Sequence, residues 1–345
     1  MNKSHFVFFD RYMKYLKISV SLILGLFFLW LALRNADLSA AAARARGLDI
    51  ALLSAAVFSF FYTQLIRAAR WHMLLDGAAA SYSDSLKVFY IGLFANYVLP
   101  FRLGEFSRPL IMKKACGASF SATLGVIFVE RLLDLAGQVF LLLFVLLFSP
   151  LPIDNSLVGY IKTALVLVAA VFAAGFAALK MVSKKSAMRG RLSAVFHRRA
   201  PEAGAKISAL IKAFNTGAGV FKDKKRLAAA FAYTVISWFV SAATIMFSMK
   251  AMSINLASPF LCACFVQAAI SVALVIPPPP GFVGTFHYFC KEGLMFYSVP
   301  ESAAVAYAVL FHALQIVLIA LPASWFMISY GISFGDFMKK NETYQ

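Results

Sequence analysis

The sequence is short of charge for its length, and shorter still of acidic residues. Of its 345 residues only 14% are charged, with 33 Lys and Arg against 15 Asp and Glu, and 61% are hydrophobic. That composition lies well outside the range of ordinary soluble domains. Several apolar runs last about 17 to 25 residues, which is the length that an α-helix needs to cross a bilayer. We therefore expect a polytopic membrane protein.

The sequence also lacks the alternating ten-residue segments of a transmembrane barrel, so an all-α fold follows. It has four cysteines, whose spacing fits neither a zinc site nor a disulfide framework: Cys116, Cys262, Cys264 and Cys290. Cys262 and Cys264 fall in an apolar helix, and we interpret them as packing residues.

Catalytic motifs are missing as well. The sequence has no Gly-rich nucleotide loop, no His-Glu-x-x-His helix and no Asp-rich metal motif. We therefore expect no enzyme, no metal and no cofactor.

The positive charge is concentrated in one region, 180–228. Thirteen Lys and Arg residues lie between Lys180 and Arg226, opposed only by Glu202 and Asp223. In a membrane protein this indicates a cytoplasmic loop, because basic residues are retained on that side. It does not indicate a nucleic-acid partner. The loop could also contact anionic lipid headgroups.

Loop charges predict the number of crossings. The first apolar stretch lacks a cleavage site, so we interpret it as a retained helix rather than a signal peptide. Both termini are expected in the cytoplasm and the chain in the inner membrane. The six expected crossings are at about 18–33, 50–66, 121–148, 158–179, 229–249 and 302–330.

Two remaining segments, near 88–120 and 260–301, must each begin and end on one side of the membrane. A re-entrant hairpin satisfies this requirement and a crossing helix does not. Each segment contains helix-breaking residues: Pro100 and Gly104 in the first, Pro280, Gly281 and Gly284 in the second. We expect one integral membrane domain, 1–345, whose halves, 1–157 and 229–345, form an inverted repeat with a substrate site near the midplane.

Ionisable residues gather around the first of these segments. A charge at the bilayer centre costs at least about 2.5 to 3.5 kcal/mol, so such residues face a partner, a cavity or a substrate. Arg102 and Arg108 offer bidentate donors that suit phosphate or carboxylate. The predicted substrate-binding residues are Asn96, Arg102, Glu105, Arg108, Glu130, Arg131 and Asp134.

Glu130 and Asp134 are four residues apart and share one face of a helix, where Arg131 can pair with Asp134. One carboxylate could then reach Arg102 or Arg108. Two interpretations remain open and compatible: a structural ion network, or a site that binds or moves a charged headgroup.

The second segment adds His287, and the last helix adds His312. A histidine titrates near neutral pH and could relay protons, although a buried histidine is more often a hydrogen-bonded core residue. We assign both to coupling or gating, together with the helix breakers. Arg67, Arg70 and Trp71 at the end of the second helix are interpreted as interfacial anchors outside the site.

These residues resemble the lysylphosphatidylglycerol synthase transmembrane-region family. Its pattern is Asn-x-x-x-Pro-x-Arg-x-Gly-Glu-x-x-Arg followed by Glu-Arg-x-x-Asp. The matching residues are Asn96, Pro100, Arg102, Gly104, Glu105, Arg108, Glu130, Arg131 and Asp134. The family continues Pro-x-Pro-Gly-Gly-x-Gly-x-x-Glu, whereas this chain has Phe282 at the second glycine, His287 at the glutamate and His312 at an expected arginine.

The resemblance implies movement of anionic phospholipids or polyprenyl-phosphate-linked lipids between leaflets. The aminoacyl-transfer chemistry of the family belongs to a separate soluble domain, for which a chain ending at Gln345 leaves no room. Two alternatives remain: a membrane-embedded enzyme acting on a lipid phosphate, and a scaffold for a lipid-linked glycosyltransferase, which would make a lipid-modifying enzyme the partner.

Overall fold

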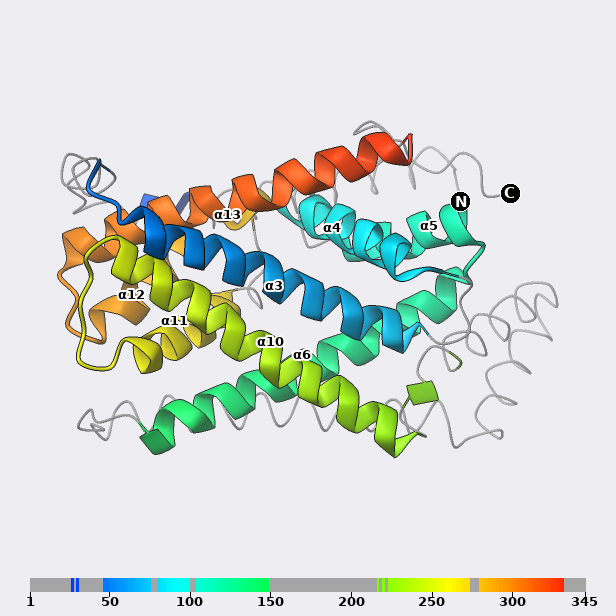
Figure 1. Cartoon of the computed structure of the whole chain (residues 1–345), viewed down its shortest axis with the longest axis horizontal. Coiled ribbons are helices and arrows are strands. Elements are labelled where there is room, and N and C mark those ends of the chain that lie inside the picture. The colour runs from blue at the N-terminus through cyan, green and yellow to red at the C-terminus, as the bar shows by residue number, and fades with distance from the viewer. Residues whose placement is uncertain are drawn as a thin grey trace, which may run out of the picture. The chain divides into compact units, whose positions relative to one another are not determined.

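The computed structural model describes residues 26–27, 29–30, 46–75, 80–99, 104–148, 216, 219–220, 223–273 and 279–331. Over these ranges every regular element is helical, which confirms the predicted all-α class for them (Figure 1). The elements are α3 (Ile50–Leu74), α4 (Tyr82–Val98), α5 (Gly104–Cys116), α6 (Phe120–Phe148), α10 (Lys224–Ala251), α11 (Pro259–Ala273), the 3₁₀ turn η3 (Pro280–Phe282), α12 (Thr285–Met295) and α13 (Glu301–Ser329).

Four of the described helices are long and apolar enough to span a membrane: α3, α6, α10 and α13. They correspond to four of the six predicted crossings. The other two, at about 18–33 and 158–179, fall on residues of which only 26–27 and 29–30 are described, and most of the basic loop lies outside the described ranges. Helix α3 continues to Leu74 rather than ending near residue 66, and α10 begins at Lys224, inside the predicted loop.

The helices begin at side-chain caps that can be read from the sequence. Asp49 accepts the N–H of Leu52 at the start of α3, and Asp223 accepts the N–H groups of Lys225 and Arg226 at the start of α10. Such caps satisfy amide groups that a helix cannot pair internally.

Two other helices, α4 and α6, begin at serine caps. Before α4, the Ser81 hydroxyl accepts the Asp84 N–H while the Asp84 carboxylate accepts the Ser81 N–H, which is a capping box. Ser119 precedes α6 and accepts the N–H of Ala122.

The chain divides into two compact units. The first comprises Met1–Tyr62, Tyr90–Ser107 and Val240–Gln345, and the second Thr63–Phe89 and Arg108–Phe239. Helices α3, α4, α5 and α10 each contribute residues to both units. The ion network described below lies wholly in the second unit, and the helix breaks, His287 and His312 lie in the first.

In the first unit, α3 and α10 are antiparallel neighbours (Figure 1). The Asp49 N–H donates to the Ala251 carbonyl at 3.0 Å. Farther along, the Ser59 hydroxyl lies 2.7 Å from the Thr244 hydroxyl and 3.1 Å from the Val240 carbonyl. Paired hydroxyls of this kind link apolar helices where no water competes.

Four of the described helices are shorter than a typical full membrane span. α4 has 17 residues, α5 has 13, α11 has 15 and α12 has 11, against about 20 for a full span. The described helices α4 and α5 are separated by residues 99–103, and α11 and α12 by 274–284. Helix α4 ends at Val98, just before the predicted break at Pro100, and the left-handed Gly281 and Gly284 lie at the second predicted break. Whether these segments are re-entrant stays a prediction.

The start of α5 lies against the backbone of α4. A Cβ atom at Gly104 would meet the Asn96 nitrogen, and would lie 2.6 Å from the Ala95 carbonyl carbon and 2.6 Å from the Gly92 oxygen. These are backbone atoms and cannot turn aside, so only glycine permits this approach.

Helix α11 carries Cys262 and Cys264, both fully buried and both free thiols. Their position agrees with the interpretation as packing residues.

Candidate functional site

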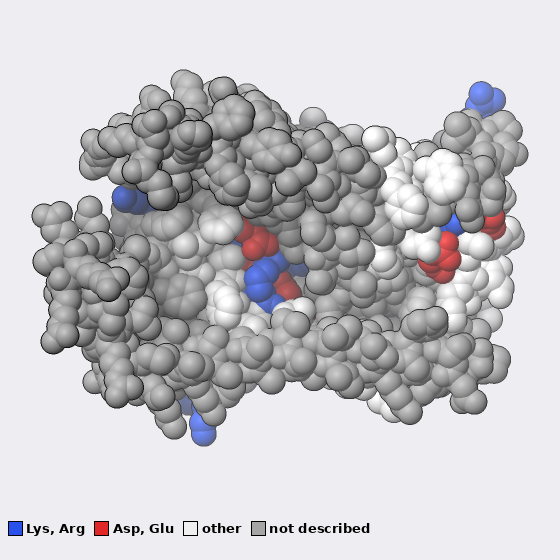
Figure 2. Space-filling model, turned by 180° about the vertical axis from the view of Figure 1, so that it is seen from behind, with Lys and Arg blue, Asp and Glu red and all other residues white. Residues whose placement is uncertain are grey.

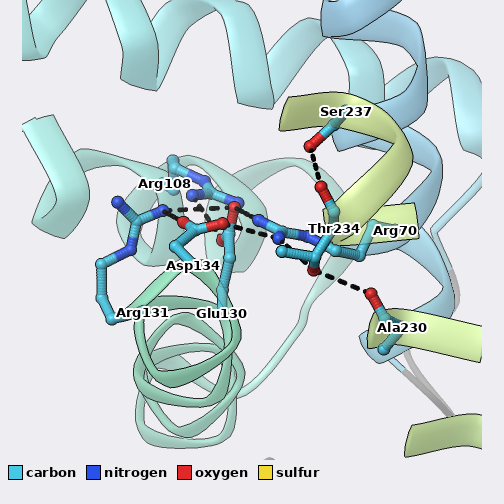
Figure 3. Close-up of polar contacts among 8 residues, drawn as sticks. All are labelled: Arg70, Arg108, Glu130, Arg131, Asp134, Ala230, Thr234 and Ser237. Atoms are coloured by element: carbon cyan, nitrogen blue, oxygen red, sulfur yellow. Dashed lines mark hydrogen bonds and ion pairs between the residues drawn. The ribbon is translucent and has the colours of Figure 1, made fainter. Parts of the chain in front are cut away.

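The candidate site is a group of ion pairs centred on α6. Glu130, Arg131 and Asp134 lie on this helix, and the Arg131 guanidinium contacts Glu130 at 3.3 Å and Asp134 at 3.0 Å (Figure 3). The predicted pairing of Arg131 with Asp134 is thereby confirmed. The predicted reach of a carboxylate to Arg108 is also confirmed, because Arg108 Nη1 lies 2.9 Å from Glu130 Oε2.

Arg70 on α3 is the central cation of the group, and sequence analysis placed it outside the site. Its Nη1 donates to Asp134 at 2.6 Å and its Nη2 to Glu130 at 3.0 Å. The same Nη1 lies 2.7 Å from the Thr234 hydroxyl on α10, which in turn donates to the Ala230 carbonyl. Arg70 therefore connects three helices of the second unit.

The interpretation of Arg70 and Trp71 as interfacial anchors is wrong. Arg70 is 1% exposed and Trp71 is fully buried, because α3 continues past both residues to Leu74. The available signal was that Trp71, Met73 and Leu74 continue the apolar pattern, interrupted by His72, since an anchor at the interface would end the apolar stretch. Arg67, by contrast, is half-buried with its guanidinium carbon 5.2 Å from the Trp238 ring centroid.

Aromatic rings hold Arg108 on α5. Its guanidinium carbon lies 4.1 Å from the Trp71 ring centroid and 5.2 Å from that of Phe89. A desolvated guanidinium over an aromatic face gains about 2 kcal/mol or more. Arg108 is thus fixed both by these rings and by Glu130.

Exposure divides the network. Glu130, Arg70 and Arg108 are 1 to 5% exposed, whereas Asp134 is 21% and Arg131 33% exposed. In the surface view, acidic and basic side chains lie next to each other at two places on this face, one of them near its centre (Figure 2). The network has a buried part and an accessible part, the latter formed by Arg131 and Asp134.

The pairing is redundant at the accessible part. Glu130 contacts three guanidinium groups, from Arg70, Arg108 and Arg131, and Asp134 contacts two, from Arg70 and Arg131. If Arg131 turned to another anion, both carboxylates would keep a cation. Chemically, the arrangement can exchange one guanidinium while leaving no buried carboxylate unpaired.

Residues of the first helix break lie in the other unit. Asn96 is half-buried near the end of α4, and its Oδ1 is buried without a hydrogen-bond partner among the described residues. Glu105 is half-buried in the first turn of α5. Pro100 and Arg102 lie outside the described residues, so their predicted roles stay predictions.

The second break has an unusual backbone. Gly281 and Gly284 have φ values of +67° and +89°, which suit glycine. Phe282, at the position where the family has glycine, also has a positive φ of +56°. A bulky residue in this region is strained by about 1 to 3 kcal/mol. Phe282 is nevertheless well buried, at 6% exposed.

Residues of the two breaks meet within the first unit. The Tyr97 ring, near the end of α4, lies 5.2 Å from the Phe282 ring and 6.1 Å from the His312 ring, measured between centroids. A Cβ at Gly281 would lie 3.8 Å from the Tyr97 carbonyl oxygen. The interrupted segments are therefore in contact, although they are nearly 200 residues apart in the sequence.

The structure also brings His287 and His312 together. His312 Nδ1 lies 3.3 Å from His287 Nε2, and both residues are buried, at 2% and 7% exposed. Farther along α12, Lys291 pairs with Glu292 at 3.2 Å and Glu301 at 3.1 Å. No cluster of three or more metal-ligating side chains occurs among the described residues.

Long apolar helices and a buried guanidinium–carboxylate network define an integral membrane protein with a polar site between its helices. The chain belongs to the family of the lysylphosphatidylglycerol synthase transmembrane region, whose model matches residues 18–323. It is 24% identical over 230 residues to the UPF0104 membrane protein MJ1078 of Methanocaldococcus jannaschii, covering 66% of this chain and 91% of that protein. No solved structure matches the chain.

Proposed function

We propose that this protein is a lipid flippase of the cytoplasmic membrane, moving an anionic phospholipid or a polyprenyl-phosphate-linked lipid between leaflets without changing it covalently. The observation that carries the proposal is the redundant ion network with one accessible guanidinium, Arg131. Family membership supports a membrane function related to lipid.

In this mechanism the lipid phosphate competes for Arg131. A guanidinium binds phosphate and carboxylate with the same fork geometry, so the exchange replaces one charge-assisted pair by another. Arg70 keeps both carboxylates paired during the exchange, which avoids an isolated buried charge. Asn96, Arg102 and Glu105 keep their predicted role as substrate-binding residues, and the acyl or prenyl chains would stay in the hydrocarbon.

The helix interruptions supply the proposed path. Non-helical backbone at membrane depth is tolerated where it lines a polar cavity, and paired interruptions in two halves of a transporter mark its substrate site. We infer that α4–α5 and α11–α12 are oppositely inserted re-entrant hairpins of an inverted repeat. The contact of Tyr97 with Phe282 supports a shared path, since it joins the two interruptions.

The test is leaflet exchange of a labelled anionic phospholipid in proteoliposomes. Arg131→Ala should lower the rate by about tenfold or more, because a hydrogen bond to a charged group contributes roughly 1.5 to 3 kcal/mol. Arg108→Ala should lower the rate and also the stability, because Arg108 is buried against Glu130.

Lys114→Ala is the matched control, an exposed cation on α5 that should exchange lipid at the wild-type rate. Wild-type rates in both arginine variants would contradict the proposed site. Mass spectra of the recovered lipid complete the test. A covalently changed lipid would indicate an enzyme instead of a flippase.

A further inference from the structure

The His287–His312 pair forms an ordered hydrogen-bond chain outside the ion network. The backbone N–H of Gly284 donates to His287 Nδ1 at 3.2 Å, and His287 Nε2 lies 3.3 Å from His312 Nδ1. The rings are nearly perpendicular, with centroids 4.8 Å apart. His312 is also stacked on Phe286 at 4.4 Å.

This hydrogen-bond chain determines which ring nitrogens carry protons when both histidines are neutral. A backbone N–H can only donate, so His287 Nδ1 must carry its lone pair and Nε2 its proton. That proton points to His312 Nδ1, which must accept it, so the His312 proton is on Nε2. The reverse arrangement would place a proton on His287 Nδ1, facing the Gly284 N–H.

An additional proton cannot enter this arrangement without breaking it. The lone pairs available are His287 Nδ1 and His312 Nδ1, and each already accepts a hydrogen bond. Protonation of His287 Nδ1 displaces the Gly284 N–H. Protonation of His312 Nδ1 places two N–H groups against each other, because His287 Nε2 also carries a proton. His287 could avoid this only by moving its proton to Nδ1, which again breaks the hydrogen bond from the Gly284 N–H.

We propose that the His287–His312 pair is a proton-binding site, and that uptake of one proton rearranges the start of α12 and so drives the lipid movement. Gly284 stands directly before α12 and follows the left-handed residues Gly281 and Phe282. Release of its N–H therefore acts where the backbone is already strained. The coupling part of this inference rests on the proposed transport function.

The neighbouring titratable groups do not compete with the two histidines for the added proton. The titratable side chain that contacts them from α4 is the Tyr97 phenol. Lys291 on α12 is engaged with Glu292 and Glu301. Other titratable groups on the packed elements include the buried Cys262 and Cys264 on α11, Cys290 on α12 and Tyr307 on α13, whose hydroxyl lies 2.7 Å from that of Ser248 on α10. The half-buried Tyr288 on α12 has Lys291 Nζ 5.9 Å from its ring centroid.

The proton site is tested by NMR of the full chain with ¹⁵N-labelled histidine in lipid, assigned with His287→Gln and His312→Gln. At neutral pH both rings should show the Nε2–H form, and acidification should add one proton to the pair together with a change in the Gly284 amide signal. A neutral His287 with its proton on Nδ1, or two rings that titrate independently, would overturn the inference.

Coupling is tested in proteoliposomes with the membrane potential clamped. If one proton moves with each lipid, a gradient of one pH unit should shift the leaflet distribution by up to about tenfold. His287→Gln and His312→Gln should each abolish this shift. His72→Gln should retain it, because His72 bonds Ser85 in the second unit.

A gradient that leaves the wild-type distribution unchanged, while exchange itself proceeds, would overturn the coupling and leave the flippase function intact. Absence of all exchange in wild type would instead contradict the flippase function, and with it the coupling. The NMR result then decides the proton site independently.

Discussion

Arg70 determines how the buried charges are held. It is 1% exposed and contacts Glu130, Asp134 and Thr234, so it connects both carboxylates to α3 and α10. Its removal would leave Asp134 with Arg131 alone. Arg108 would still face Glu130.

Arg70→Met should lower the free energy of unfolding by about 3 to 5 kcal/mol, because it breaks a buried ion network by removing one partner. Reversible unfolding in mixed micelles measures this. Arg46→Met, which alters an exposed arginine, should change the stability little. Adding Glu130→Gln to Arg70→Met should cost less than the sum of the single changes. Equal stability of the Arg70 and Arg46 variants would show that the network contributes nothing to the fold.

The residue types of the site could be predicted from the sequence, and part of its pairing as well. Spacing alone places Glu130 and Asp134 on one helix face and Arg131 within reach of Asp134, because the helix period fixes which neighbours meet. Arg70 could not be assigned in this way. It is 60 residues from Glu130, and only helix packing decides which distant side chain reaches a given face.

At the scale of elements, the close approach of α5 to α4 depends on Gly104. A side chain there would overlap backbone atoms of Gly92, Ala95 and Asn96. Helix α5 could accept a larger residue only by moving away from α4, and Arg108 lies one turn farther along α5.

Gly104→Ala should therefore destabilise the protein by about 1 to 3 kcal/mol, which is typical of overpacking, and should slow lipid exchange. The same two assays, unfolding and exchange, measure both effects. Gly47→Ala is the matched control, because a Cβ at Gly47 meets nothing within 4 Å. If the Gly104 variant behaves like the Gly47 variant, the approach of the two helices has no role in the site.

The caps Asp49, Ser81, Ser119 and Asp223 are local signals for helix starts. Apolar length alone placed the start of α10 near residue 229, five residues after its actual start at Lys224. Helix α3 was predicted to stop before Arg67 because a basic residue usually marks the interface, but the burial of Arg70 by carboxylates of another helix removes that constraint.

At the scale of the molecule, the proposed topology makes a prediction about sidedness. Single cysteines at the exposed positions Ser83 and Lys114, which flank most of α4 and α5, should both react with an impermeant thiol reagent from the cytoplasmic side. Cysteines at Asn255 and Ser298, which flank α11 and α12, should both react from the opposite side.

These labelling experiments use a chain whose native cysteines, Cys116, Cys262, Cys264 and Cys290, are replaced. Exchange activity of that background is the control for its fold. Labelling of the Ser83 and Lys114 cysteines from opposite sides would mean that α4 and α5 cross the membrane together, and the inverted repeat would have to be abandoned.

The sequence by itself determined the class of protein, since runs of apolar residues long enough to span a bilayer are a local property of the chain. It also predicted the end of α4 before Pro100 and the left-handed backbone at Gly281 and Gly284, although Pro109 and Pro322 lie inside helices. Tertiary structure alone decided that Arg70 completes the ion network, that Tyr97 meets Phe282, and that His287 faces His312. Those contacts join segments far apart in the chain, and their geometry depends on how whole helices pack.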